Sequence, residues 1–282
     1  VAGIYLFGER AAVLLAVSVA SAVLAEAAWQ RLAGQPLQVR DLSAAVTGLL
    51  LGLNLPSSAP WWLAVVGSAF AIVVVKQLFG GIGHNFLNPA LAARAVLLTS
   101  WPARMTTFFL PERLMEIGGA SAAQFGDAVT SATPLAKGGT AIMDLLLGNV
   151  PGSIGEVCKV AILLGFAYLL VRGTIGFHIP VLFVGTVALM TWLLGGDPLV
   201  AVLSGGVLFG AVFMATDYTT NPMLARGQCV FAVGCGVIVT LIRQYGGYPE
   251  GVTYAILLMN ILTPLLDKWM KRRVYGEVKQ HA

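Results

Sequence analysis

A polar, hydroxyl-rich stretch, DAVTSATPLAK at residues 127–137, interrupts a chain that is otherwise strongly apolar. One interpretation is a helix start, because Thr133 suits the N-cap position and Pro134 suits the first helical position. A cap does not explain the residues ahead of Thr133, which are Asp127, Thr130, Ser131 and Ala132. An exposed threonine hydroxyl can also form a phosphoester, and a small neighbour such as Ala132 leaves room for an enzyme to reach it.

A second stretch with chemical potential is LFGGIGHNFLNPALAARAVLL, residues 78–98. Gly80 and Gly81 break a helix, while Asn85 and Asn88 offer amide donors and acceptors just before Pro89 opens the next helix. Two interpretations stay open: a turn in which Asn88 is the N-cap, or a ligand site. A phosphate-binding loop is a poor interpretation, because no Gly-Lys-Ser/Thr follows the glycines and no βαβ unit surrounds them.

A third stretch, MATDYTTNP at residues 214–222, places Asp217 where an apolar segment ends. We favour a solvated carboxylate at the interface; an inward-facing Asp217 would be a candidate cation or proton site. Arg94 lies inside an apolar segment and is expected to face the bundle interior. We expect no metal site, since the three histidines, His84, His178 and His281, form no cluster with cysteines.

The composition identifies the setting for these residues. Hydrophobic residues make up 57% of the chain and charged residues 11%, against about 25% charged in soluble domains. Apolar runs approaching a bilayer span recur along nearly the whole chain, so the sequence predicts an all-α integral membrane protein. The net charge of +4 does not indicate nucleic-acid binding, because much of it lies at the C-terminal end, in Lys268, Lys271, Arg272, Arg273 and Lys279.

About ten apolar segments are predicted. The first is a stub at the start of the chain, which we interpret as part of a truncated helix. The others cover about 11–29, 42–55, 61–79, 88–101, 155–172, 178–194, 198–215, 227–242 and 251–270. The excess of Lys and Arg favours an orientation with the C-terminus in the cytoplasm and the long loop on the outer face.

Two short similarities indicate an internal inverted repeat. KQLFGG (76–81) resembles RQYGG (243–247), and the segments at 42–55 and 198–215 both follow an aspartate and end in a break. Two inverted five-helix repeats place broken helices near the membrane midplane. The predicted organisation is a first membrane repeat at 1–101, an outer loop at 102–154, a second membrane repeat at 155–270 and a basic cytoplasmic tail at 271–282.

The Asp-x-x-Thr-Ser-Ala-Thr pattern of residues 127–133 resembles the acceptor sequence of flavin transferases, which join FMN through its phosphate to the final threonine. The resemblance implies that Thr133 is the attachment point and that Asp127, Thr130, Ser131 and Ala132 are recognised by the transferase.

Four stretches together resemble the D subunit of the Rnf complex, an ion-translocating ferredoxin:NAD oxidoreductase related to the B subunit of sodium-translocating NADH:quinone reductase. The stretches are KQLFGGIGHNFLNPALAARA, DAVTSATPLA, MATDYTTNP and IRQYGGYPEGVTYAILLMNILTPLLDKW. Many members have Gly where this chain has Ser131. The resemblance implies a urea-transporter-like bundle in a bacterial or archaeal inner membrane, carrying covalent FMN and a noncovalent riboflavin.

The same resemblance implies a redox subunit that works with flavin and iron–sulfur subunits, is matured by a flavin transferase, and couples electron transfer to Na⁺ or H⁺ movement. Ferredoxin and NAD would bind to other subunits. We place the riboflavin near Gly80, Gly81, Asn85 and Asn88 as our own hypothesis. Two alternatives remain: a passive solute channel, since inverted repeats also build facilitators, and a scaffold subunit whose Thr133 is never modified.

Overall fold

The computed structural model describes residues 1–109, 142–246 and 251–270. Within these ranges the chain forms helices and turns and contains no β-strand, although an isolated bridge pairs Pro56 with Ser153. The prediction of an all-α protein is confirmed for this part of the chain. Asp127, Thr130, Ser131, Ala132 and Thr133 lie outside the described residues.

The first half of the chain packs around its long first helix. In order, its elements are α1 (Ala2–Leu32), η1 (Val39–Asp41), α2 (Ser43–Leu53), α3 (Trp61–Ala69), η2 (Phe70–Lys76), η3 (Gln77–Phe79), α4 (Pro89–Ser100) and α5 (Pro102–Met105). η2 continues α3 as a π-helix. Both α2 and α3 pack against α1. The α1–α2 contact depends on a small residue, because a Cβ at Gly48 would lie 2.7 Å from the Ser18 carbonyl oxygen.

The second half is built around α10 and α13, which pack along each other. Its elements are α8 (Ile142–Leu147), α9 (Lys159–Val171), α10 (His178–Leu193), α11 (Pro198–Leu203), α12 (Val207–Phe209), η5 (Gly210–Met214), α13 (Ala225–Tyr245) and α14 (Val252–Met270). α11 starts with Asp197 as N-cap, whose carboxylate accepts from Leu199 N at 2.9 Å, followed by Pro198 at the first helical position.

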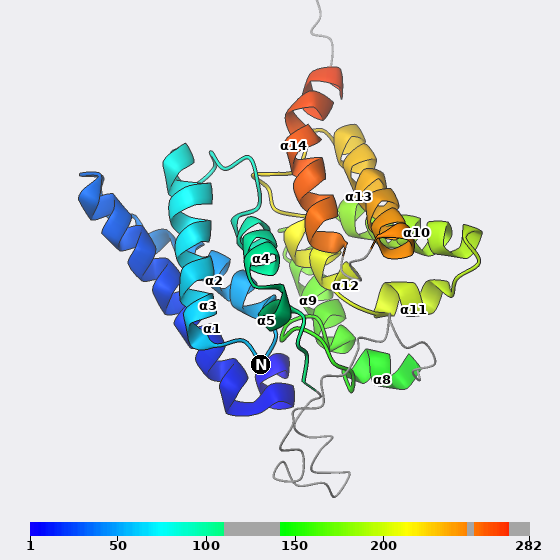
Figure 1. The fold of residues 1–282 in the computed structure, drawn as a ribbon. Helices are drawn as coiled ribbons and strands as arrows, with labels where there is room; N and C mark the ends of the chain where they lie inside the picture. Colours follow the sequence, from blue (N-terminus) through cyan, green and yellow to red (C-terminus); the bar gives the residue numbers. More distant parts are fainter. Residues whose placement is uncertain (110–141, 247–250, 271–282) are drawn as a thin grey trace, which may run out of the picture.

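The two halves lie side by side, with blue to cyan helices on one side of Figure 1 and green to red helices on the other. They are joined where α14 packs against α4. They are also joined by main-chain bonds, Ile154 N to Leu55 O at 3.1 Å and Gly155 N to Leu53 O at 2.7 Å. A shared core of buried apolar side chains runs through both halves.

The helices match a membrane-embedded protein. Among the described residues, three helical stretches are long and apolar enough to cross a bilayer: Ala2–Leu32, Trp61–Phe79 and Ala225–Tyr245. Four shorter apolar helices accompany them: Ser43–Leu53, Pro89–Ser100, Lys159–Val171 and His178–Leu193. A multi-pass membrane protein is therefore the coarse architecture, and the ten-helix repeat stays a prediction.

The structure differs from the predicted segments at two breaks. The segment predicted at 198–215 is interrupted at Ser204–Gly206, which separates α11 from α12. The segment predicted at 155–172 becomes helical only at Lys159, because residues 153–155 pair with the chain after α2. Within α1, Gly8 has φ of 67° and separates the start of the helix from the rest.

Candidate functional site

A cavity of about 400 Å³ opens between the two halves of the chain, and its mainly apolar lining includes charged and amide side chains. Its first wall comes from η1 and α2, from the end of η2, and from the chain before and at the start of α4: Asp41, Ser43, Val46, Thr47, Leu50, Lys76, Ile82, Asn85, Asn88, Pro89 and Ala90. Its second wall comes from the end of α9 and from the chain around η5: Leu169, Thr174, Ile175, Val212, Phe213, Thr216, Asp217, Tyr218 and Thr219. The volume lies within the range of small-molecule sites.

The glycine-rich break shapes this cavity without lining it. Gly80 and Gly81 have φ of 112° and 90°, the left-handed region that favours glycine, and they turn the chain at the end of η3. The turn brings Asn85 and Asn88 to the cavity wall, whereas Gly80 and Gly81 are not among its lining residues. The structure therefore unites two of the four residues predicted for a flavin site and gives the glycines a supporting position.

Asn88 is the N-cap of α4, as one of the two interpretations has it, and it also lines the cavity. Its side-chain oxygen accepts from Leu91 N at 3.2 Å and caps α4. Its side-chain nitrogen lies 3.4 Å from Asp217 Oδ2 and 3.5 Å from the Met214 carbonyl oxygen. Asn85 similarly donates to Thr219 Oγ1 at 3.1 Å across the cavity. Both amides thus connect the two halves.

Asp217 faces the cavity and is not the solvated interface carboxylate that the sequence favours. It is half-buried, and its Oδ1 accepts from Thr219 Oγ1 at 3.0 Å and from Thr219 N at 3.3 Å. Burial raises the pKa of this carboxyl above its ordinary value, although the bonds from Thr219 act in the opposite direction. The sequence could not show this position, because the opposing wall comes from a segment about 130 residues away.

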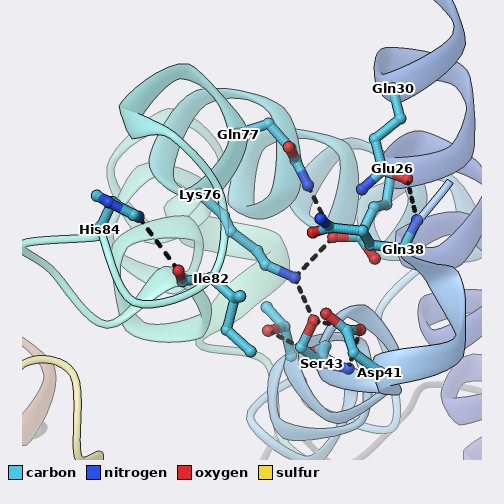
Figure 2. Close-up of polar contacts among 10 residues, drawn as sticks. Glu26, Gln30, Gln38, Asp41, Ser43, Lys76, Gln77, Ile82 and His84 are labelled. Carbon is cyan, nitrogen blue, oxygen red and sulfur yellow. Dashed lines mark hydrogen bonds and ion pairs between the residues drawn. The ribbon is translucent and has the colours of Figure 1, made fainter. Parts of the chain in front are cut away.

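Figure 2 shows the charged part of the cavity wall, which the sequence does not reveal as a site. Lys76 Nζ lies 2.7 Å from Glu26 Oε1 and 2.5 Å from Ser43 Oγ. Ser43 Oγ in turn donates to Asp41 Oδ1 at 2.7 Å, and Gln77 donates to Glu26 Oε1 at 2.7 Å. In the sequence, Glu26 lies within the predicted segment 11–29 and Lys76 near the end of the predicted segment 61–79, and nothing there pairs them.

A second buried charged cluster lies at the break between α11 and α12. Arg94, buried as predicted, donates from Nη1 to Asn54 Oδ1 at 2.6 Å. Lys159 donates to the carbonyl oxygens of Glu156 and of Gly205, the latter at 2.8 Å. Both cations act electrostatically on the buried Glu156 carboxylate. Lys159 begins α9 and is buried, so it does not belong to the solvent-exposed charges on which an orientation argument depends.

Among the described residues, no group of three or more His, Cys, Asp or Glu side chains is placed to hold a metal ion. The fold and the cavity together define a class: a helical, multi-pass membrane protein with broken helices and, between its two halves, a cavity that contains charged and amide side chains.

Comparison with known proteins identifies the family. The model of the NQR2, RnfD, RnfE family matches residues 1–276. The D subunit of the Na(+)-translocating ferredoxin:NAD(+) oxidoreductase complex of Acetobacterium woodii is 50% identical over 285 residues, covering 98% of this chain and 86% of the relative. The D subunit of the proton-translocating ferredoxin:NAD(+) oxidoreductase complex of Clostridium ljungdahlii is 39% identical, covering 97% of this chain and 86% of the relative.

The D subunit of an ion-translocating oxidoreductase complex from Halorhodospira halophila is 38% identical, covering 99% of this chain and 88% of the relative. The chain belongs to the NQR2, RnfD, RnfE family.

Proposed function

We propose that this chain is the D subunit of an Rnf-type ion-translocating ferredoxin:NAD oxidoreductase and works together with the other subunits of that complex. The observation that carries the proposal is the similarity over nearly the whole chain to relatives that bear this name. Loading by a flavin transferase and residence in an inner membrane, with the 102–154 loop outside and the C-terminus in the cytoplasm, belong to the same proposal.

The chain would take part in electron transfer through FMN esterified to Thr133. A bound flavin supplies one- and two-electron chemistry, and the protein positions it and tunes its potential. The Asp-x-x-Thr-Ser-Ala-Thr pattern supports this part of the proposal. On this interpretation Asp127, Thr130, Ser131 and Ala132 present Thr133 to the transferase.

The cavity between the halves fits a second, noncovalent flavin, which we propose to be riboflavin. Its volume of about 400 Å³ suits a small organic molecule. The Asn85 and Asn88 amides could donate to and accept from a polar ring edge, and apolar walls at Val212 and Phe213 could contact its faces. These residues would bind and orient the ring and keep water away from it.

Asp217 is proposed as the cation or proton site of the chain. Support comes from its position inside the cavity, from its half-buried carboxylate and from the cap that Thr219 provides. The relatives are named for sodium in one case and for protons in another, and a single carboxylate serves either ion.

The inverted repeat forms part of the proposal. Lys76, in the KQLFGG stretch, bonds to Ser43 at the start of α2. Arg243, in the RQYGG stretch, donates to Ala201 O at 2.6 Å and to Ser204 O at 3.1 Å, both on or next to α11. Lys76 thus connects η2 to α2, which follows Asp41, and Arg243 connects α13 to α11, which follows Asp197. The same arrangement in both halves supports the inverted repeat.

The mass of the subunit tests the redox function. Intact mass and in-gel flavin fluorescence after denaturation are measured on the subunit from cells with and without the transferase. The expected result is an added FMN minus one water that is absent without the transferase and in Thr133→Ala. Thr140→Ala, the same change elsewhere in the loop, should leave the flavin in place.

An unmodified mass from cells with an active transferase would overturn the covalent flavin. A colourless native protein would in addition overturn the riboflavin proposal and leave the solute channel as the better interpretation. A yellow native protein of unmodified mass would leave a subunit whose flavin is held only by noncovalent contacts.

A further inference from the structure

Glu26 lies behind the wall of the cavity, where a carboxylate is costly without a partner. It is 1% exposed on α1, and it does not line the cavity. Its Oε1 accepts from Lys76 Nζ and Gln77 Nε2, both at 2.7 Å, while no hydrogen bond to its Oε2 is made within the described part of the chain. Glu26 therefore depends on Lys76 for its charge compensation.

Lys76 stands between Glu26 and the cavity. Its side chain is buried, yet the residue lines the cavity wall, and Nζ also donates to Ser43 Oγ, which donates to Asp41. The ammonium thus has a carboxylate behind it and a route toward a second carboxylate in front of it, as Figure 2 shows. The ion pair with Glu26 therefore holds the ammonium at the buried carboxylate and not at Asp41.

The charge balance of the cavity follows from this pairing. Its charged lining residues are Asp41, Lys76 and Asp217. With Lys76 held by Glu26, the two aspartates have no full counter-charge from the wall, and the cavity attracts a cation. Without Glu26, the ammonium would serve the cavity side, where Ser43 already links it to the exposed Asp41, and its charge would compete with a mobile cation for Asp217 across the cavity.

We propose that Glu26 is a positioning residue that draws the Lys76 ammonium away from the cavity carboxylates and thereby sets the affinity of the cavity for a monovalent cation. The proposal rests on the proposed cation site at Asp217. Lys76 is a built-in competitor of that cation, and Glu26 keeps the competitor occupied.

The test uses the purified complex reconstituted in vesicles, with Na⁺ as the probe. The Na⁺ concentration that half-saturates electron transfer is measured for wild type, Glu26→Gln, Lys76→Met and the double variant. Glu26→Gln should raise this concentration on the order of tenfold, because a freed ammonium now acts on the aspartates. Lys76→Met should lower it severalfold, since the tethered ammonium that competes with Na⁺ is gone.

The double variant distinguishes this role from a merely structural one. The double variant has no ammonium at position 76 to compete with Na⁺. Its half-saturating Na⁺ concentration should therefore match that of Lys76→Met and lie below the value for Glu26→Gln. Glu9→Gln, the same change at an exposed position of α1, should behave as wild type. If Glu26→Gln does not assemble, Lys76→Met and the double variant still carry the test.

Shifts in the same direction for both single variants, or a double variant that is worse than either, would overturn the proposal. So would wild-type turnover that does not respond to Na⁺. Asp217→Asn distinguishes failure of the cation site from failure of the role of Glu26. If the Na⁺ response survives this change, the cation site at Asp217 is overturned. If Asp217→Asn abolishes the Na⁺ response but the Glu26 and Lys76 variants do not shift in opposite directions, the cation site stands and only the role of Glu26 is overturned. The flavin proposal is tested by mass and does not depend on either result.

Discussion

At the scale of single residues, the site depends on polar side chains that serve two partners. Asn88 caps α4 with its oxygen and approaches Asp217 with its nitrogen. Lys76 is divided between Glu26 and Ser43. Such groups cannot be assigned from sequence alone, because each partner lies on a different helix. The sequence located Asn85, Asn88 and Asp217 as candidates, whereas the pairing of Glu26 with Lys76 follows only from how α1 packs against α3 and η2.

The two roles of Asn88 can be separated by substitution. Asn88→Ala should destabilise the protein by about 1 kcal/mol through loss of the cap and should also release the noncovalent flavin. Asn88→Ser retains a capping oxygen but is too short to replace the amide, so it should lose the flavin with little loss of stability. Flavin released on denaturation, compared with thermal midpoints, measures both effects. Full retention of flavin in stable Asn88→Ala would contradict the riboflavin site.

The raised pKa of Asp217 gives a pH dependence with a definite sign. The folded protein binds this proton more tightly than the unfolded chain does, so the carboxyl favours folding at low pH. This contribution is lost as the pH rises from the ordinary value of 3.8 through the raised value. Asp217→Asn should therefore flatten this part of the stability profile and keep or increase the thermal midpoint near neutral pH. A lower midpoint at neutral pH would mean that the ionised carboxylate stabilises the fold.

Arg94 is the residue whose loss should cost most. Arg94→Met removes the donor to Asn54 and leaves the buried Glu156 with Lys159 as its remaining cation. Breaking a buried charged cluster on one side typically costs about 3–5 kcal/mol. Arg243→Met, which removes bonds from a half-buried arginine to two carbonyl oxygens, is the matched control and should cost less. Thermal unfolding of the purified complex variants compares the two.

At the scale of helices, apolar length predicted where most elements lie, and small residues determine how closely they pack. The predicted segments 42–55, 61–79, 178–194 and 251–270 correspond to α2, α3 with η2 and η3, α10 and α14. The break at Ser204–Gly206 was missed because an apolar composition continues across it. Nothing local in the sequence shows that Gly155 will donate to Leu53 O from the far half of the chain.

The α1–α2 contact gives a prediction at this scale. A Cβ at Gly48 would lie 2.7 Å from Ser18 O and 2.8 Å from Ala22 Cβ, so Gly48→Leu should separate the helices and reduce the yield of folded protein. At Gly185 on α10 a Cβ would meet nothing within 4 Å, and Gly185→Leu should be tolerated. The yield of monodisperse complex in detergent measures both. Equal yields would show that α2 is not held against α1 as described.

At the scale of the whole molecule, the cavity gathers chain segments that the orientation argument placed on one side of the membrane. Asp41, Lys76, Ile82, Thr174 and Asp217 all line it, and each belongs to a stretch predicted to face the cytoplasm. The opposite end of the bundle carries α5 and α8, both in the lower half of Figure 1. The distribution of Lys and Arg along the chain predicts that these segments share one side of the membrane. Lys76 and Lys159 are buried and add nothing to that charge argument.

Single cysteines can test the orientation. In a background without Cys158, Cys229 and Cys235, Gln35→Cys lies between α1 and α2, and Arg104→Cys lies at the opposite end; both positions are exposed. A membrane-impermeant maleimide added to spheroplasts should label Arg104→Cys and spare Gln35→Cys until the membrane is permeabilised. The reverse pattern would invert the proposed topology and place the 102–154 loop beyond the reach of an exported transferase.

The main-chain bonds between residues 153–155 and the end of α2 fix one end of this helix to the second half of the chain. One end of α2 is fastened to the stretch of chain that follows the long loop, and its other end carries Ser43, Val46 and Thr47 in the cavity wall. An α-helix of this length, about 16 Å, is stiff. A displacement of residues 153–155 would therefore move α2 as a rigid element, together with the part of the cavity wall that it carries.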